Sequence, residues 1–178
     1  FVMGLEKQTD AKSMMGELKR RLSKFGLGLN EKKTRLLEFG RYAAERRKRR
    51  GMRRPETFDF LGFTHYCSMN KSGRFFIMRK TQGARMIRKL KELRIEARRR
   101  MHWPLKKQHR WLAAVLRGHY GYYGYLGNSR ALSNFAYEVR KLWFRALCRR
   151  SQKNAMSWVR FNRFLKVFPL PVPRIIRT

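Results

Sequence analysis

The sequence predicts an α+β fold, in which a helix and short antiparallel strands are followed by a bundle of helices. Two observations lead to this prediction. Residues 1–80 contain one helical pattern and several short aromatic-rich runs separated by turn residues, which is typical of strands. After residue 80 the apolar residues recur only at spacings of three and four, which indicates amphipathic helices. We therefore expect two parts, residues 1–80 and residues 81–178.

The composition predicts an almost wholly cationic surface. The 178 residues include 45 Lys and Arg against 11 Asp and Glu, a formal net charge of +34, while 43% of the residues are hydrophobic. That apolar content excludes a disordered basic tail, which could not form a core. Because so large an uncompensated charge calls for a polyanionic partner, nucleic acid is the first candidate and an anionic membrane the second.

Several other classes of protein are excluded. No apolar run approaches the roughly 18 residues of a membrane-spanning helix, and the first residues lack the pattern of a signal peptide. Cys67 and Cys148 lie far apart, which favours reduced intracellular thiols over a disulfide framework or a zinc site. With only two aspartates, Asp10 and Asp59, the chain is poorly equipped for metal-dependent catalysis.

In the first part, residues 1–5 predict the end of a strand. A helix follows, with Thr9 or Asp10 as its N-cap and Gly26 at its end, and residues 34–39 predict a further strand. The stretch 41–54 contains eight basic residues in fourteen, and we expect a solvated loop there.

Two strands are expected at residues 58–66 and 74–79. The polar residues Asn70-Lys71-Ser72-Gly73 lie between them, and polar turn residues between aromatic-rich runs indicate a hairpin.

The second part predicts three helices with short connections, which favours a small bundle. Thr81 is the expected N-cap of the first helix, Pro104 opens the second and Asn128 caps the third. An amphipathic segment, residues 157–168, then leads into a proline-rich stretch, residues 169–173, that cannot be helical.

The first of these helices carries a strongly basic face. A solvated face is the ordinary interpretation of such a run, but solvated helices interleave both signs of charge. Here Glu92 and Glu96 are the only local counter-charges, so contact with nucleic-acid phosphates is favoured over a solvated face.

A glycine- and tyrosine-rich run, residues 116–127, admits two interpretations. Close helix packing around small residues is favoured, and close approach of an RNA or DNA backbone is the alternative. His119 has no partner at metal-ligand spacing, and no nucleophile–histidine set can be identified, so the sequence offers no self-sufficient active site.

Five motifs follow one another in a fixed order. They are Phe1-Val2, FGLGLNEKKTRLLEFGR (residues 25–41), FDFLGF (58–63), LRGHYGYY (116–123) and WVRFN (158–162). In these motifs the chain strongly resembles bacterial group II intron reverse transcriptases, also called maturases. The resemblance implies the C-terminal part of a right-hand palm in residues 1–80 and the thumb, or maturase X domain, in residues 81–178.

The resemblance also implies roles for individual residues. Lys33 matches a palm lysine near the phosphates of the incoming nucleotide. The primer grip, which positions the primer 3′ end, matches Phe60, Leu61, Gly62 and Phe63, and Gly62 would let the sugar–phosphate backbone approach. The nucleic-acid-binding residues of the thumb are expected to be Arg85, Arg88, Lys89, Arg94, Arg98, Arg117 and Tyr122.

The chain departs from the family in one respect. Family members carry Tyr-Ala-Asp-Asp immediately before the Phe-Val motif, and these carboxylates hold catalytic Mg²⁺. Because this chain lacks them, we expect it to bind no Mg²⁺ itself and to be inactive alone. It is either a fragment of a larger polypeptide or one part of a split reading frame, and the sequence does not distinguish the two. The implied partners are intron RNA, an RNA template, an RNA–DNA or DNA primer duplex and the missing finger and palm portion. The implied location is the bacterial cytoplasm, in association with the nucleoid or a ribonucleoprotein and without a membrane.

Two alternatives stay open at the level of sequence. One is a non-enzymatic basic RNA-binding protein, such as a ribosomal component. The other is a reverse transcriptase with a different task, in CRISPR adaptation or in defence, which motif spacing does not distinguish from intron mobility.

Overall fold

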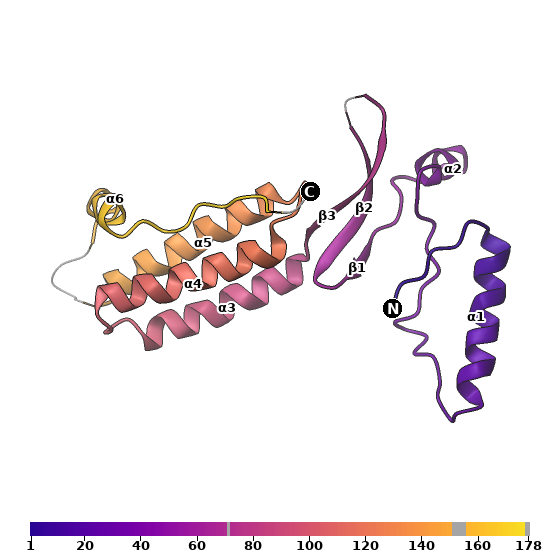
Figure 1. The fold of residues 1–178 in the computed structure, drawn as a ribbon, viewed down its shortest axis with the longest axis horizontal. Helices are drawn as coiled ribbons and strands as arrows, with labels where there is room; N and C mark the ends of the chain where they lie inside the picture. Colours follow the sequence, from indigo (N-terminus) through magenta and orange to yellow (C-terminus); the bar gives the residue numbers. More distant parts are fainter. Residues whose placement is uncertain (71, 151–155, 177–178) are drawn as a thin grey trace. The chain divides into compact units, whose positions relative to one another are not determined.

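A computed structural model describes residues 1–70, 72–150 and 156–176 of the chain. Within these residues it contains six helices and one three-stranded sheet, so the predicted α+β class is confirmed (Figure 1). In chain order the elements are α1 (Gln8–Ser23), α2 (Ala43–Arg49), β1 (Phe58–Phe60), β2 (Phe63–Met69), β3 (Phe75–Thr81), α3 (Gly83–Arg99), α4 (Leu105–Tyr123), α5 (Ser129–Cys148) and α6 (Trp158–Val167).

The chain divides into two compact units. The first, here called the N-terminal unit, comprises Phe1–Phe60 and Tyr66–Ile77. The second, here called the helical unit, comprises Leu61–His65 and Met78–Thr178. Strands β2 and β3 therefore contribute residues to both units, and the palm–thumb division near residue 80 stays a prediction.

Two strands predicted in the N-terminal unit are wrong. Residues 1–5 and 34–39 have no regular secondary structure, because neither stretch is paired with a neighbouring strand that would satisfy its backbone groups. The N-cap prediction for α1 is also wrong. The helix begins after Lys7, and the Thr9 hydroxyl donates to the Asp10 carboxylate at 3.2 Å instead of capping the backbone.

The basic stretch predicted as a loop contains helix α2. Arginine, lysine, alanine and glutamate all have high helix propensity, so a charged run is compatible with a helix. Ion pairs stabilise this one: Glu45 pairs with Arg49 one turn later, and Glu38 pairs with both Arg46 and Arg50. The helix ends before Gly51.

The strand expected at residues 58–66 is two strands joined by a tight turn. Leu61 and Gly62 have φ values of +48° and +82°. Positive φ at both central residues is the signature of a two-residue hairpin turn, which reverses the chain between β1 and β2. The hairpin predicted around residues 70–73, between β2 and β3, is confirmed, and there Asn70 Oδ1 accepts a hydrogen bond from the Arg74 amide at 2.7 Å.

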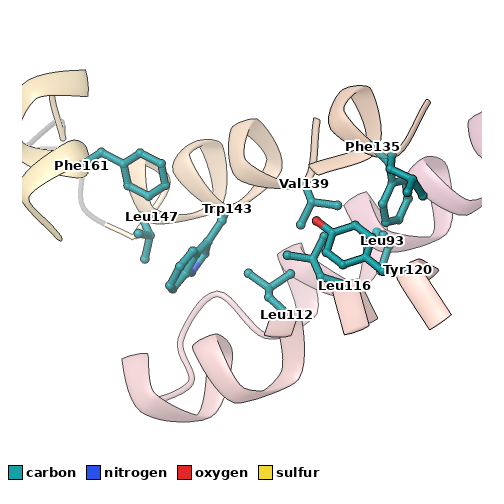
Figure 2. Close-up of a cluster of buried hydrophobic side chains, with 10 residues drawn as sticks. Leu93, Leu112, Leu116, Tyr120, Phe135, Val139, Trp143, Leu147 and Phe161 are labelled. Carbon is teal, nitrogen blue, oxygen red and sulfur yellow. The ribbon is translucent and has the colours of Figure 1, made fainter. Parts of the chain in front are cut away.

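The predicted helical bundle is present in the helical unit, where α3, α4 and α5 lie side by side (Figure 1). Its core contains leucines from all three helices together with large aromatic residues of α4, α5 and α6 (Figure 2). Trp143 and Phe135 are almost completely buried, and Phe161 joins α6 to the same core. Because an aromatic side chain buries a large apolar area, these three residues dominate the packing.

Buried polar side chains fix the helix connections at both ends of the bundle. Gln108 donates from Nε2 to the carbonyls of Met101 and Trp103 and accepts from Trp143 Nε1, all at 2.9 Å. These bonds tie the α3–α4 connection to α5. Pro104 precedes the first residue of α4 and serves as its N-cap, one position earlier than predicted.

At the opposite end, Asn128 forms three hydrogen bonds and is only 1% exposed. Its Oδ1 accepts from the Thr81 amide, while its Nδ2 donates to Thr81 Oγ1 and to the Tyr123 carbonyl, all at 2.8 Å. Asn128 is the N-cap residue of α5, as predicted, but its side chain makes no capping bond to that helix and instead joins the end of β3 to the end of α4. Thr81, the predicted N-cap of the first bundle helix, is instead the last residue of β3, and Gln82 is the N-cap of α3.

After α6, which Ser157 caps, the proline-rich segment is extended, as its composition requires. Three hydrogen bonds hold this segment against α4. These join His109 Nε2 to the Pro169 carbonyl, the Tyr120 hydroxyl to the Pro171 carbonyl, and the Ile176 amide to the Gly124 carbonyl.

Replacing Asn128 should destabilise the helical unit strongly. Asn128→Ala leaves the Thr81 amide buried without its partner and removes the bonds to Thr81 Oγ1 and the Tyr123 carbonyl, so the free energy of unfolding should fall by about 2 kcal/mol or more in urea denaturation. Asn134→Ala, at an exposed position of α5, should change it by no more than about 0.5 kcal/mol. Equal effects of the two substitutions would show that the Asn128 bonds are not needed.

Candidate nucleic-acid interface

A cavity of about 400 Å³ lies between α3 and α4 in the helical unit. Helix α3 contributes Arg85, Arg88 and Lys89, and α4 contributes His119, Tyr122 and Tyr123. Spacings of three and four residues bring each set onto one face of its helix. Four of the predicted nucleic-acid-binding residues, the three cations and Tyr122, therefore meet at one place.

The cavity is positively charged. Arg85, Arg88 and Lys89 are exposed, and Glu92 is the one carboxylate among the lining residues. Lys89 Nζ lies 3.5 Å from this carboxylate, while neither arginine has an ion-pair partner within the described part of the chain. At least two cationic groups are thus available to an anionic ligand.

The inner wall is aromatic and uncharged. The His119 ring stacks on Phe135 with the centroids 3.6 Å apart and lies 4.6 Å from the Tyr123 ring. Burial lowers the pKa of His119 to about 4, and the charge of Lys89 adds to this effect, so the imidazole is neutral at pH 7. Its Nε2 atom is buried without a hydrogen-bond partner among the described residues. Residue spacing excludes His119 as a metal ligand but predicts no other function for it.

The turn that the resemblance assigns to the primer grip packs against the same end of α4. The Tyr122 hydroxyl donates to the Leu61 carbonyl at 2.7 Å, and Phe63 stacks on the Tyr122 ring with centroids 5.8 Å apart. Leu61, Gly62 and Phe63 are thereby placed beside the cavity. Phe60 and the exposed Lys33 belong to the N-terminal unit.

Gly62 is explained by the protein's own packing. A Cβ atom there would lie 3.0 Å from the Tyr123 hydroxyl and 3.4 Å from Arg85 Cδ, and its φ of +82° disfavours any other residue. The resemblance attributes this glycine to the close approach of a nucleic-acid backbone, but the packing within the protein is enough to explain it.

Arg94 and Arg98 lie on the opposite flank of α3. They line a small crevice between α3 and α5 together with Arg145 and Arg149. Within the described residues none of these four arginines has an ion pair. The stripe that the sequence presents as one basic face is thus divided by the bundle into two surfaces. Arg117, exposed on α4, lines neither of them.

Arg145 and Arg149 were not among the predicted binding residues. Their spacing of four places them on one face of α5, but only the packing of α5 against α3 brings that face next to Arg94 and Arg98. The spacing of Arg145 and Arg149 can be read from the sequence, but the packing of α5 against α3 cannot.

The glycine-rich run has two kinds of glycine. Close packing, the favoured interpretation, applies at Gly124, where a Cβ atom would meet the carbonyl oxygens of Tyr120 and Arg174. It is wrong for Gly118 and Gly121, because nothing lies within 4 Å of a Cβ built at either position. Gly118 also lines the cavity, and Gly121 does not.

Other kinds of site find no support in the described residues. No group of three or more His, Cys, Asp or Glu side chains there is arranged to hold a metal ion. None of the described helices has both the length and the apolar character needed to cross a membrane.

Comparison of the chain with protein-family models, with curated proteins and with solved structures gives no match.

The low pKa of His119 predicts an acid sensitivity of the fold. An unfolded histidine titrates near pH 6.5, so below that pH the unfolded chain binds the proton more tightly than the folded chain does. The stabilising effect of a neutral His119 is therefore complete above about pH 6.5 and is lost as the pH falls toward 4. In thermal unfolding, the midpoint of the wild type should fall further between pH 7 and pH 5 than that of His119→Gln.

The control for this comparison is His102→Gln, which replaces an exposed histidine. It should leave the pH dependence of the wild type unchanged. If His119→Gln and the wild type lose the same number of degrees over this interval, the imidazole is not held neutral by its surroundings.

Proposed function

We propose that this chain binds RNA, and duplexes that contain RNA, through its helical unit, as part of a group II intron-type reverse transcriptase or maturase. The helical unit acts as the thumb, and the N-terminal unit is an incomplete palm. The observation that carries the proposal is the meeting of Arg85, Arg88 and Tyr122 with the Leu61–Gly62 turn around one cationic cavity.

The charge distribution supports nucleic acid as the partner. Both flanks of α3 present arginines without carboxylate partners among the described residues, and guanidinium groups bind phosphates in a bidentate manner. Along its 17 residues α3 is about 25 Å long, which is enough to follow several consecutive phosphates. Contacts of this kind depend on the backbone and the shape of the nucleic acid and not on its sequence.

The position of the turn supports the polymerase-type assignment. The residues that resemble a primer grip and the residues that resemble a thumb surface come from distant parts of the sequence. In the helical unit Tyr122 donates to Leu61, and Arg85 lies beside Gly62. An arrangement of this type lets one unit contact the primer end and the adjoining duplex together.

The surface of the N-terminal unit supports an incomplete palm. Among its described residues only Ala43 is fully buried. Large apolar side chains are exposed instead, and they include Phe1, Val2, Met3, Leu5, Phe25, Leu27 and Leu36. Because soluble proteins rarely leave so many apolar side chains in water, this unit is suited to packing against another polypeptide surface, such as the remaining finger and palm portion.

The residues present do not fit a catalytic Mg²⁺ site. Asp10 in α1 and Asp59 in β1 are both exposed, and the described residues contain no cluster of three metal-ligating side chains. Nucleotidyl transfer by a two-metal site needs several carboxylates close together. In this proposal the catalytic carboxylates belong to the rest of the polymerase, and this chain contributes nucleic-acid binding.

Removing the α3 cations should weaken RNA binding and reduce the dependence of the binding constant on salt concentration, because fewer counterions are released from the phosphates. Arg88→Gln with Lys89→Gln tests the cavity flank, and Arg94→Gln with Arg98→Gln tests the opposite flank. For RNAs of different sequence, each pair should lower the affinity by a similar factor. It should also reduce the slope of log K against log salt by about 0.7–0.9 for each phosphate that is no longer neutralised, as measured by fluorescence anisotropy.

The matched control is Lys12→Gln with Lys24→Gln, which removes the same charge from exposed positions of the N-terminal unit. Its effect on the slope should be clearly smaller. Unchanged slopes for both α3 pairs would mean that these cations are only solvated, and that the helical unit is not the RNA-binding surface.

A further inference from the structure

The cavity between α3 and α4 differs from the rest of the cationic surface because it is hollow. Its volume of about 400 Å³ lies within the range of small-molecule sites, roughly 300–1,000 Å³. The phosphates of a duplex lie on the outside of the helix and need only an exposed row of cations. A hollow of this size is not needed for that contact, and its lining indicates what else it can accept.

The lining separates two kinds of chemistry. Arg85, Arg88 and Lys89 are charged and exposed, while His119 and Tyr123 are aromatic and neutral. Burial raises the pKa of Tyr123, so its phenol keeps its proton, just as burial keeps His119 unprotonated. Cations that bind a phosphate beside neutral rings that stack on a base are the combination by which proteins bind unpaired nucleotides.

Gly118 keeps this hollow open. It lies in the middle of α4, where glycine is an unfavourable helix residue, and no neighbouring atom prevents a larger side chain there. Neither helix formation nor packing explains the glycine. Any longer side chain at this position would project into free space that adjoins the cavity.

We propose that the cavity binds one unstacked nucleotide of single-stranded RNA, with its base against the His119, Tyr122 and Tyr123 wall. Its phosphate binds Arg88 and Lys89. This inference rests on the proposed RNA-binding function and adds a nucleotide site to it. Glu92 supplies carboxylate oxygens at the lining that can accept a hydrogen bond from a base edge or a ribose hydroxyl.

The first test compares two probes with equal charge. A fluorescein-labelled 12-nucleotide oligoadenylate and an abasic ribose-phosphate oligomer of the same length are titrated with the full chain at constant salt. Base stacking is worth a factor of about 5 to 150, so the abasic oligomer should bind more weakly by that factor. Equal affinities would overturn the nucleotide site but not RNA binding, whereas no binding of either probe would overturn both.

The second test fills the cavity without changing its charge. Gly118→Leu should reduce the affinity for oligoadenylate to that for the abasic oligomer, and it should leave the abasic affinity within about twofold of wild type. Gly121→Leu is the matched control, because this glycine has equally free space in the same helix but does not line the cavity. Both variants replace a helical glycine, so both should keep or raise the thermal midpoint of the wild type.

A blunt RNA duplex separates base binding from phosphate binding. The duplex has no unstacked base, so Gly118→Leu should leave its affinity within about twofold of wild type. If Gly118→Leu weakens duplex and single strand equally, or if it leaves the preference for oligoadenylate over the abasic oligomer intact, the cavity is not a nucleotide site. Gly118→Ala, with a smaller side chain, repeats the comparison and should give an intermediate loss.

Discussion

The three hydrogen bonds of the buried Asn128 are the constraint on which the candidate site depends. They join Thr81, immediately before α3, to Tyr123, at the end of α4, and both of these residues line the cavity between the two helices. These hydrogen bonds are formed by a buried side chain, and leaving a buried polar group without its partner costs free energy. They therefore favour one relative position of α3 and α4. The Leu61–Gly62 turn and the cations of α3 are held in place around that end of the bundle.

Helix α3 must bury its apolar residues and keep its charged side chains in solvent, and its packing in the bundle places the two kinds of residue on different faces. Leu93 and Ala97 are buried against the other helices, which leaves two flanks for charged side chains. One flank borders α4 and forms the cationic cavity. The other borders α5, where Arg145 and Arg149 join Arg94 and Arg98. Since neither flank carries enough carboxylates to balance its charge, a polyanion that bridges these cations relieves their mutual repulsion.

The sequence predicts the helices well because each carries an apolar stripe that specifies both its period and its buried face. Strands depend on partners elsewhere in the chain, which explains why residues 34–39 do not form one and why the Leu61–Gly62 turn lies hidden within a longer expected strand. Helix α2 is not predicted, because consecutive charged residues are compatible with a loop as well as with a helix. Of the site, the cations of α3 and Tyr122 could be predicted. The cavity could not, since the open space at Gly118 and the burial of His119 arise only when α3 and α4 pack.

Binding of RNA by the helical unit, at the cavity between α3 and α4, is tested most directly by ultraviolet crosslinking. The full chain is crosslinked to single-stranded RNA that contains 4-thiouridine, and the crosslinked peptides are identified by mass spectrometry. Crosslinks should concentrate on His119, Tyr122 and the facing turn of α3, and Gly118→Leu should abolish them. Crosslinks confined to the basic residues 41–54, with none on α3 or α4, would contradict binding at the cavity.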